Sequence, residues 1–246
     1  MEKLILTEES LGVFTITLNR QVKKNAINAA MYDLLCQYLQ YANDSAHIHC
    51  LLIQGDENCF CAGNDFTEPT NEEGLPAFIF IEQLIKFTKP IIAAVAGPAV
   101  GIGTTLLLQC DMVIAANNSK FILPFVHLGI CLEAGASLLL PLKVGPNRAF
   151  ELAVLGTPFT AEQGYEYGIV NQVCQPNEVI VKAQNVAQSI ARLPVDAVQT
   201  SRRLIRQSTD KLMLDVVKNE KDEVHRLMET DDFKSILYKF SQSSIS

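Results

Sequence analysis

The pattern of apolar and polar positions changes at residue 145. Before it, short apolar runs alternate with segments whose apolar residues recur at helical spacing. The predicted strands are 4–9, 13–19, 50–55, 91–95 and 112–116, and the predicted helices are 29–42, 75–87 and 101–110, with Asn28 as the N-cap of the first helix. This alternation predicts an α/β core with buried parallel strands.

Beyond residue 145 the pattern is mainly helical. The predicted helices are 146–155, 160–167, 177–191, 195–208, 210–228 and 231–240, and residues 169–174 form the one extended stretch. The long C-terminal helices carry both charged and apolar faces. Such faces indicate packing against the core or against a neighbouring subunit.

One apolar segment raises the question of a membrane span. Residues 91–108 hold no charge and approach the length of a spanning helix. Gly97-Pro98 interrupts the segment, and Gly101 and Gly103 weaken it as a helix. We therefore predict a strand, a turn and a buried helix, and no association with a membrane.

Composition narrows the class of protein. The 246 residues suit one large domain, and 48% hydrophobic with 19% charged content supports a sizeable core. A net charge of -7 argues against non-specific binding to nucleic acid. The seven cysteines are irregularly spaced, which favours reduced thiols and no metal site. No signal-peptide or peroxisomal pattern is found, so we expect a cytoplasmic protein.

Two glycine-containing turns follow predicted strands. Residues 59–65, CFCAGND, either present backbone amides or form only a structural turn. Residues 97–106, GPAVGIGTTL, match neither GxGxxG nor the Walker pattern, so nucleotide binding is weakly supported. The free N–H groups at the start of the following helix suit an oxyanion, and close packing of the glycines is the competing explanation.

Glu133 stands in an apolar stretch, VHLGICLEAGASLLL. Between Glu82 and Glu151, the other carboxylate is Asp111. Burying a carboxylate is costly unless it is hydrogen-bonded or stays protonated. From the residues alone, a hydrogen-bonded structural carboxylate is favoured over a functional one.

Together these stretches resemble the crotonase, or enoyl-CoA hydratase/isomerase, superfamily. The matching stretches are TITLNRQVKKNAIN, FCAGNDF, KPIIAAVAGPAVGIG, CDMVIAA, FVHLGICLEAGASLLLP and FTAEQGYEYGIVNQV. The resemblance implies the ClpP/crotonase fold, a spiral of ββα units with a C-terminal helical oligomerisation region. Residues 1–190 would form the acyl-CoA-binding core, and residues 191–246 the helices that build trimers or hexamers and cover the active site.

The resemblance also implies a mechanism. In the family, two backbone N–H groups hold the thioester oxygen of an acyl-CoA, and here they belong to Asn64 and Ile102. The two glutamates of the hydratases are replaced by Thr105 and Phe125. The HLG motif and following acid resemble peroxisomal-type Δ3,Δ2-enoyl-CoA isomerases, which implies that Glu133 is a proton shuttle.

The implied substrate is an acyl-CoA thioester, with coenzyme A as part of the substrate and no separate cofactor. Lys24 either meets the phosphates of coenzyme A or is a solvated lysine. The implied substrate-binding residues are Lys24, Ala26, Ala62, Gly63, Asn64, Asp65, Phe66, Gly101 and Ile102. The helix with Phe78, Phe80 and Ile81 is expected to border the acyl tunnel.

Two alternatives to the isomerase function stay open. One is an enoyl-CoA hydratase, or another enolate-forming crotonase, that uses water positioned by Glu133. The other is an acyl-CoA-binding homologue without catalysis. Retention of Glu133 with both amide-bearing turns argues against a homologue without catalysis.

Overall fold

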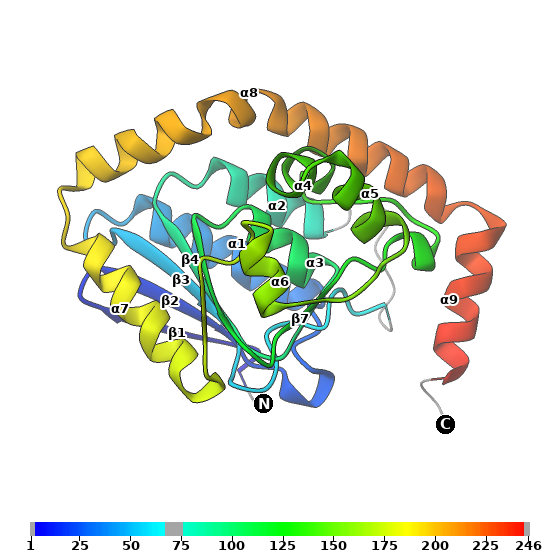
Figure 1. Ribbon diagram of the computed structural model, residues 1–246, viewed down its shortest axis with the longest axis horizontal. Coiled ribbons are helices and arrows are strands. Elements are labelled where there is room, and N and C mark those ends of the chain that lie inside the picture. Colours follow the sequence, from blue (N-terminus) through cyan, green and yellow to red (C-terminus); the bar gives the residue numbers. More distant parts are fainter. Residues whose placement is uncertain (1–2, 67–75, 244–246) are drawn as a thin grey trace.

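The computed structural model describes residues 3–66 and 76–243 (Figure 1). Its larger sheet has the strand order β1-β2-β3-β4-β6-β9. β1 and β2 pair antiparallel, and each later neighbour is parallel. The strands are β1 (Ile5–Ser10), β2 (Val13–Leu18), β3 (Cys50–Gln54), β4 (Ile91–Val95), β6 (Met112–Ala116) and β9 (Gln172–Cys174). The α/β core with buried parallel strands predicted from the sequence is confirmed.

A smaller sheet stands beside the larger one. It joins β5 (Pro98–Val100), β7 (Lys120–Ile122) and β8 (Phe159–Thr160) in that order. β5 begins three residues after β4 ends, so one short turn carries the chain from one sheet to the other. That turn contains Gly97 and leads into the sequence that follows β5.

Helices cover both faces of the larger sheet because its parallel strands are apolar on both sides. α7 (Val179–Ala191) packs its alanines on one face, against alternate residues of β3, β4 and β6. α1 (Ala29–Asp44) and α2 (Pro76–Lys86) belong to the core on the other face. Asn28 is the N-cap of α1, as predicted, because its side chain accepts from the Met31 N–H.

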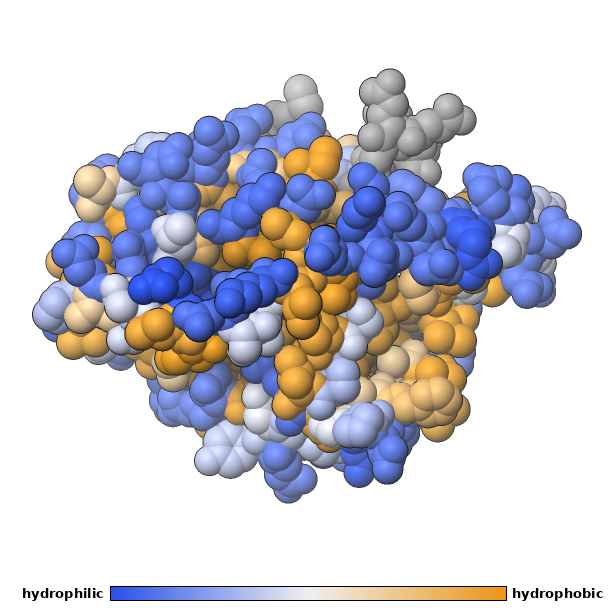
Figure 2. All heavy atoms as spheres, turned by 90° about the horizontal axis from the view of Figure 1, so that it is seen from above, coloured by the Kyte–Doolittle hydropathy of each residue, from blue (hydrophilic) through white to orange (hydrophobic). Residues whose placement is uncertain are grey.

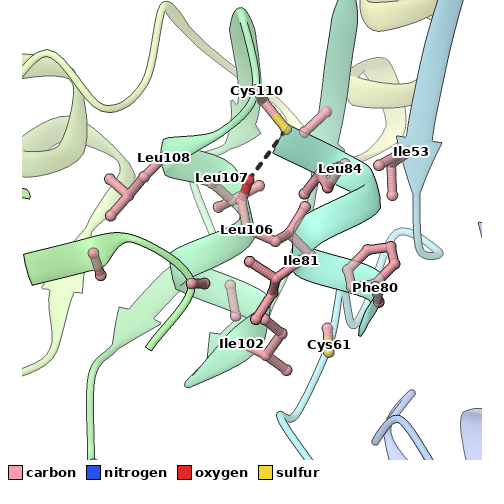
Figure 3. Close-up of a cluster of buried hydrophobic side chains, with 14 of the residues drawn as sticks. Ile53, Cys61, Phe80, Ile81, Leu84, Ile102, Leu106, Leu107, Leu108 and Cys110 are labelled. Atoms are coloured by element: carbon pink, nitrogen blue, oxygen red, sulfur yellow. Dashed lines mark hydrogen bonds between the residues drawn. The ribbon is translucent and has the colours of Figure 1, made fainter. Parts of the chain in front are cut away.

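The remaining helices lie around this core. They are η1 (Gln21–Lys23), α3 (Ile102–Thr105), η2 (Leu106–Leu108), η3 (Val126–Leu128), α4 (Ala136–Val144), α5 (Pro146–Val154), α6 (Ala161–Glu166), η4 (Pro176–Glu178), α8 (Val195–Met228) and α9 (Asp231–Ser243). Figure 3 shows α2 facing α3 and η2 through Ile81, Leu84 and Leu106, with the Cys110 thiol donating to the Leu106 carbonyl. Apolar contact of this kind fixes the position of α3 on the core.

Three details of the sequence prediction are wrong. The expected helix over 101–110 is a four-residue α-helix followed by a 3-10 turn. α4 and the short strands of the smaller sheet, β5, β7 and β8, were not expected. The two helices expected over 195–208 and 210–228 form the single 34-residue α8, because no glycine or proline interrupts that stretch.

α8 crosses over the top of the molecule in Figure 1 and packs on α2 and α4. Arg202 joins it to the core through Asp111 and the Phe87 carbonyl, at 2.7 Å each. Figure 2, which looks down on this side, shows hydrophobic residues beside the hydrophilic ones. Within the described residues, no helix combines the length and the apolar character that crossing a membrane requires.

Candidate active site

Two turns meet at the carboxyl ends of β3 and β4. These strands are parallel neighbours, so the loops after them leave the same edge of the sheet. A bridge joins the loops: the Cys61 N–H donates to the Pro98 carbonyl, and the Val100 N–H donates to the Cys61 carbonyl, at 3.1 and 2.9 Å. The two glycine-containing turns singled out in the sequence therefore lie side by side.

Glycine is required where these turns approach each other. Gly63 has φ +99°, and a Cβ there would lie 3.1 Å from the Val100 carbonyl oxygen. A Cβ on Gly103 would lie 2.7 Å from the Cys61 carbonyl oxygen. Both contacts are with backbone, so a side chain at either position would separate the turns.

The Asn64 and Ile102 N–H groups donate no hydrogen bond to any described residue. Ile102 is the first residue of α3, where an N–H has no intrahelical acceptor. Asn64 follows the left-handed Gly63. Two adjacent turns thus each offer a backbone donor, which is the arrangement that an oxyanion hole requires.

The segment predicted to bind coenzyme A runs beside the first turn. The Ala62 N–H donates to the Lys24 carbonyl at 3.0 Å, and the Ile27 N–H donates to the Gly63 carbonyl at 2.8 Å. Asp65 forms an ion pair with Arg20 at 2.5 Å. The Lys24 side chain is exposed, and Ala26 is half-buried. The predicted substrate-binding residues of both segments therefore form one continuous region.

Glu133 opens a tight turn just before α4. Ala134 and Gly135 have φ values of +66° and +75°, and the Ala136 N–H donates to the Glu133 carbonyl at 3.1 Å. Positive φ at both central residues defines a type I′ turn. Glycine is favoured at both of those positions, so Ala134 adopts a backbone conformation that is unusual for a residue with a Cβ.

The Glu133 carboxyl group is buried, with 2% of the residue exposed. Burial and, to a lesser extent, the negative charge of Glu220 raise the pKa of Glu133, while a hydrogen bond from the Asn64 side chain lowers it, and the resulting pKa is about 7. Oε1 of Glu133 has no hydrogen-bond partner among the described residues. A buried carboxyl with a pKa near neutrality and an unoccupied oxygen suits a general base.

Sequence reasoning missed the groups that surround Glu133. The Tyr32 hydroxyl donates to Oδ1 of Asn64, which leaves the Asn64 amide hydrogens for Glu133. Burial raises the pKa of Tyr32 well above its usual value, so it stays a neutral donor. Glu220, a second buried carboxylate, comes from α8. Its spacing from Met213, Val217 and Val224 was the signal that it faces inward.

The two positions that hold glutamates in hydratases carry no acid. Thr105 is fully buried and its hydroxyl is unpartnered among the described residues, and Phe125 is 3% exposed. Phe78, Phe80 and Ile81 are buried in α2, with the Phe80 ring 5.7 Å from that of Tyr32. No group of three or more His, Cys, Asp or Glu in the described ranges is placed to bind a metal.

Two apolar hollows lie near the segment that carries Glu133. A small one of about 20 Å³ is lined by Phe66, by Leu128 of η3 and by three residues of α9. A larger one of about 600 Å³ lies between α4, α5 and α8, and Glu220 is part of its wall. α9 therefore lies beside η3, and α8 lies beside Cys131 and Leu132, which directly precede Glu133.

The sequence and the fold match proteins of one family. A profile described as enoyl-CoA hydratase/isomerase matches residues 8–243. The chain is 37% identical to the 1,2-epoxyphenylacetyl-CoA isomerase of Escherichia coli K12, over 79% of this chain and 78% of that protein. It is 32% identical to enoyl-CoA delta isomerase 2 of Rattus norvegicus, over 93% of this chain and 58% of the rat protein.

A solved structure has nearly the same fold. The enoyl-CoA hydratase/isomerase of Pseudoalteromonas atlantica T6c superposes with a TM-score of 0.94 at 32% identity, covering 98% of both chains. The profile match spans nearly the whole chain, and both the isomerase and the hydratase names occur among its relatives. The chain belongs to the enoyl-CoA hydratase/isomerase family, whose members act on acyl-CoA thioesters.

Proposed function

We propose that this protein is a Δ3,Δ2-enoyl-CoA isomerase. The observation that carries the proposal is Glu133: it is buried, its pKa is raised to about 7, and one of its oxygens is unpartnered. The hydratase positions 105 and 125 hold Thr and Phe. A single acid suffices to move one proton between two carbons.

The reaction begins with a 3-enoyl-CoA whose thioester oxygen accepts from the Asn64 and Ile102 N–H groups. The Glu133 carboxylate removes a proton from C2, and the electron pair forms a dienolate held by those two donors. The Glu133 carboxylic acid then returns the proton to C4. The double bond ends between C2 and C3, and the product is a trans-2-enoyl-CoA.

Transfer of the same proton requires that water stay out of this step, because a protonated Glu133 that exchanges with solvent would deliver a solvent proton to C4. The apolar neighbours and the burial of Glu133 support such exclusion. Asn64 contributes twice in this account. Its backbone N–H is an oxyanion donor, and its side chain stabilises the ionised form of Glu133.

A second candidate follows from the relative with 37% identity, whose name states that it isomerises 1,2-epoxyphenylacetyl-CoA. The same oxyanion donors and the same carboxylate would serve a CoA ester with an aryl group. Enoyl-CoA hydration is less favoured, since the acids that handle water in hydratases are replaced by Thr105 and Phe125.

The test uses purified protein and trans-3-hexenoyl-CoA. The ultraviolet absorbance that appears on conjugation with the thioester is followed for the wild type and for Glu133→Gln. We expect the wild type to isomerise and the variant to lose at least about 10³-fold in kcat, as expected for a required proton carrier. A wild type that binds CoA esters without isomerising 3-enoyl-CoA would overturn the proposal. A parallel assay with 1,2-epoxyphenylacetyl-CoA distinguishes the second candidate.

We also propose self-association, as a trimer or a pair of trimers. The support is a group of large apolar side chains more than half exposed on α4, α5 and α8: Leu142, Phe150, Leu204, Ile205 and Leu212. Isolated exposed apolar residues are ordinary, but a group of this size favours an interface. Sedimentation equilibrium measures the assembly, and a monomer at micromolar concentration would contradict it.

A further inference from the structure

The peptide that joins Ala134 to Gly135, directly after Glu133, is held at both ends. Its carbonyl oxygen accepts from Gln109 Nε2 at 2.8 Å. Its N–H donates to Glu220 Oε2 at 2.7 Å. A peptide plane with both its oxygen and its hydrogen engaged cannot rotate without breaking a buried hydrogen bond, which is unfavourable because the group left behind has no water to replace its partner.

Both contacts lead to α8. Arg206 of α8 donates to the backbone and the side-chain oxygen of Gln109, at 3.0 Å each, and so fixes the amide that meets Ala134. Glu220 stands on the same helix, about four turns later. Between them, Met213 lies over Gly135 so closely that a Cβ there would fall 2.3 Å from its sulfur. α8 therefore holds the turn in three ways: Glu220 accepts from the Gly135 N–H, Met213 packs on Gly135, and Arg206 fixes the Gln109 side chain that donates to Ala134.

Glu220 is a buried acceptor with three donors. Besides the Gly135 N–H, it receives the Ser137 N–H at 2.9 Å and the Ser137 hydroxyl at 2.5 Å. Gly135 is the N-cap of α4 and has no side chain to accept from the first turn of that helix. Glu220 fulfils this role from a distant part of the sequence. Burial raises the pKa of Glu220 above its ordinary value, and the hydrogen bonds from its three donors oppose that shift by stabilising the ionised form.

We propose that Glu220 is a positioning residue for the reaction, which holds the turn that carries Glu133 through the Gly135 and Ser137 N–H groups and places a second buried carboxyl group beside that turn. The inference rests on the proposed function for the role of Glu133. It extends that function by assigning to α8 the control of when Glu133 holds its proton.

The electrostatic surroundings agree with this assignment. The charge of Glu220 is the second cause, after burial, that raises the pKa of Glu133. The other ionisable groups that interact with the two carboxyls are Tyr32 on α1, which interacts with Glu133, and Cys131 before α4, which interacts with both. The pKa values of Tyr32 and Cys131 are raised by burial, so both are neutral at pH 7. No described cationic side chain forms an ion pair with Glu133 or Glu220.

The experiment measures the titration of Glu133 directly. The infrared carbonyl band of its protonated carboxyl is assigned by the loss of that band in Glu133→Gln, and its midpoint is followed against pH. In Glu220→Gln we expect the midpoint to fall by roughly one pH unit, as for removal of a neighbouring like charge. The acid limb of kcat/KM should move with it. In Glu220→Asp, which keeps the charge, the midpoint should stay near wild type while kcat falls roughly tenfold from misplacement of the turn.

Glu223→Gln is the matched control. Glu223 lies one turn further along α8 with an exposed side chain paired to Arg226, so its removal should leave the Glu133 midpoint unchanged. If Glu220→Gln does not fold, Ser137→Ala replaces it. Loss of that hydroxyl weakens the ionised form of Glu220 and should lower the Glu133 midpoint by a smaller amount.

Two results separate the proposals. A lower melting temperature in Glu220→Gln with an unmoved Glu133 midpoint would overturn this inference and leave Glu220 as a helix cap only. If the Glu133 midpoint moves in Glu220→Gln but the wild type fails to isomerise 3-enoyl-CoA, the inference stands and the proposed function is overturned. The infrared titration needs no turnover, so the two failures are distinguishable.

Discussion

The turns that offer the Asn64 and Ile102 N–H groups and the turn that carries Glu133 are built differently. The first two follow adjacent parallel strands and are joined by backbone hydrogen bonds around Cys61. The Glu133 turn lies outside the sheets, and its contacts come from Gln109 and from α8, more than 80 residues later in the chain. Main-chain donors are positioned by the sheet, whereas the side-chain base depends on a distant helix.

This difference predicts how each part fails. A change between the two glycine-containing turns should remove oxyanion stabilisation without changing the proton affinity of Glu133. A change around the Glu133 turn should shift the pH dependence while the oxyanion donors stay in place. The predictions below use that contrast, from the largest expected effect to the smallest.

Gly103→Ala should lower kcat by about 10²–10³-fold, the usual effect of losing one oxyanion donor. The new Cβ would meet the Cys61 carbonyl oxygen at 2.7 Å and push α3, with the Ile102 N–H, away from the first turn. Steady-state kinetics with trans-3-hexenoyl-CoA measures the effect. Gly164→Ala is the control, because this helical glycine is also crowded, with Val170 at 2.9 Å, but lies in α6. Equal losses in both variants would refute the special role of the Cys61 contact.

Glu133→Gln should raise stability at pH 8 by up to roughly 3 kcal/mol, since one pKa unit corresponds to about 1.4 kcal/mol. The pKa of Glu133 is raised from 4.5 to about 7, so the folded protein is favoured while the residue is protonated. That stabilisation is full below pH 4.5 and is lost as pH rises to 7. Melting temperatures at one protein concentration should therefore converge at low pH and separate at pH 8. A difference that does not depend on pH would contradict the raised pKa.

Asn64→Ala should move the acid limb of kcat/KM to higher pH, by roughly one unit, because its side-chain hydrogen bond lowers the pKa of Glu133. This shift is opposite in sign to that expected for Glu220→Gln. The variant keeps the backbone N–H at residue 64, so the oxyanion donor remains. Tyr32→Phe, which removes only the donor to Asn64, should show a smaller shift in the same direction. A shift to lower pH in Asn64→Ala would refute the assignment of the hydrogen bond.

Ala134→Gly should change stability by no more than about 1 kcal/mol. Ala134 has φ +66°, and a left-handed conformation costs a residue with a Cβ about 1–2 kcal/mol, which glycine would avoid. The greater freedom of glycine in the unfolded chain opposes this gain in stability. Activity should stay within about threefold of wild type because the turn keeps its type I′ geometry. Denaturant unfolding measures the stability. A large loss of activity would show that the alanine methyl group has a role in the site.

Much of this arrangement could be predicted from the sequence, and the part that could not has a physical reason. Apolar runs and glycines defined the strands and the two turns, because those signals are local. The break expected near residue 209 was wrong, since changes of face in a long helix mimic a boundary when no glycine or proline marks one. Glu133 was found because a lone carboxylate in an apolar stretch is itself a local signal.

Glu220 lay beyond that reasoning. Glu220 stands among charged residues of α8 that are mostly exposed, so the composition of the surrounding sequence gave no signal that Glu220 is buried. Only its register with Met213, Val217 and Val224 placed it on the inner face. Which residues that face would meet depends on how α8 crosses the core, and this is a tertiary property that no short stretch of sequence contains.

The central claim is that one carboxylate carries one proton between two carbons. The most direct measurement uses trans-3-hexenoyl-CoA deuterated at C2, with NMR analysis of the trans-2-hexenoyl-CoA product formed in ordinary water. If Glu133 shuttles the proton in a site that excludes water, deuterium removed from C2 should be found at C4. A product whose C4 carries only solvent hydrogen would contradict the claim that Glu133 delivers to C4 the same hydrogen that it removes from C2.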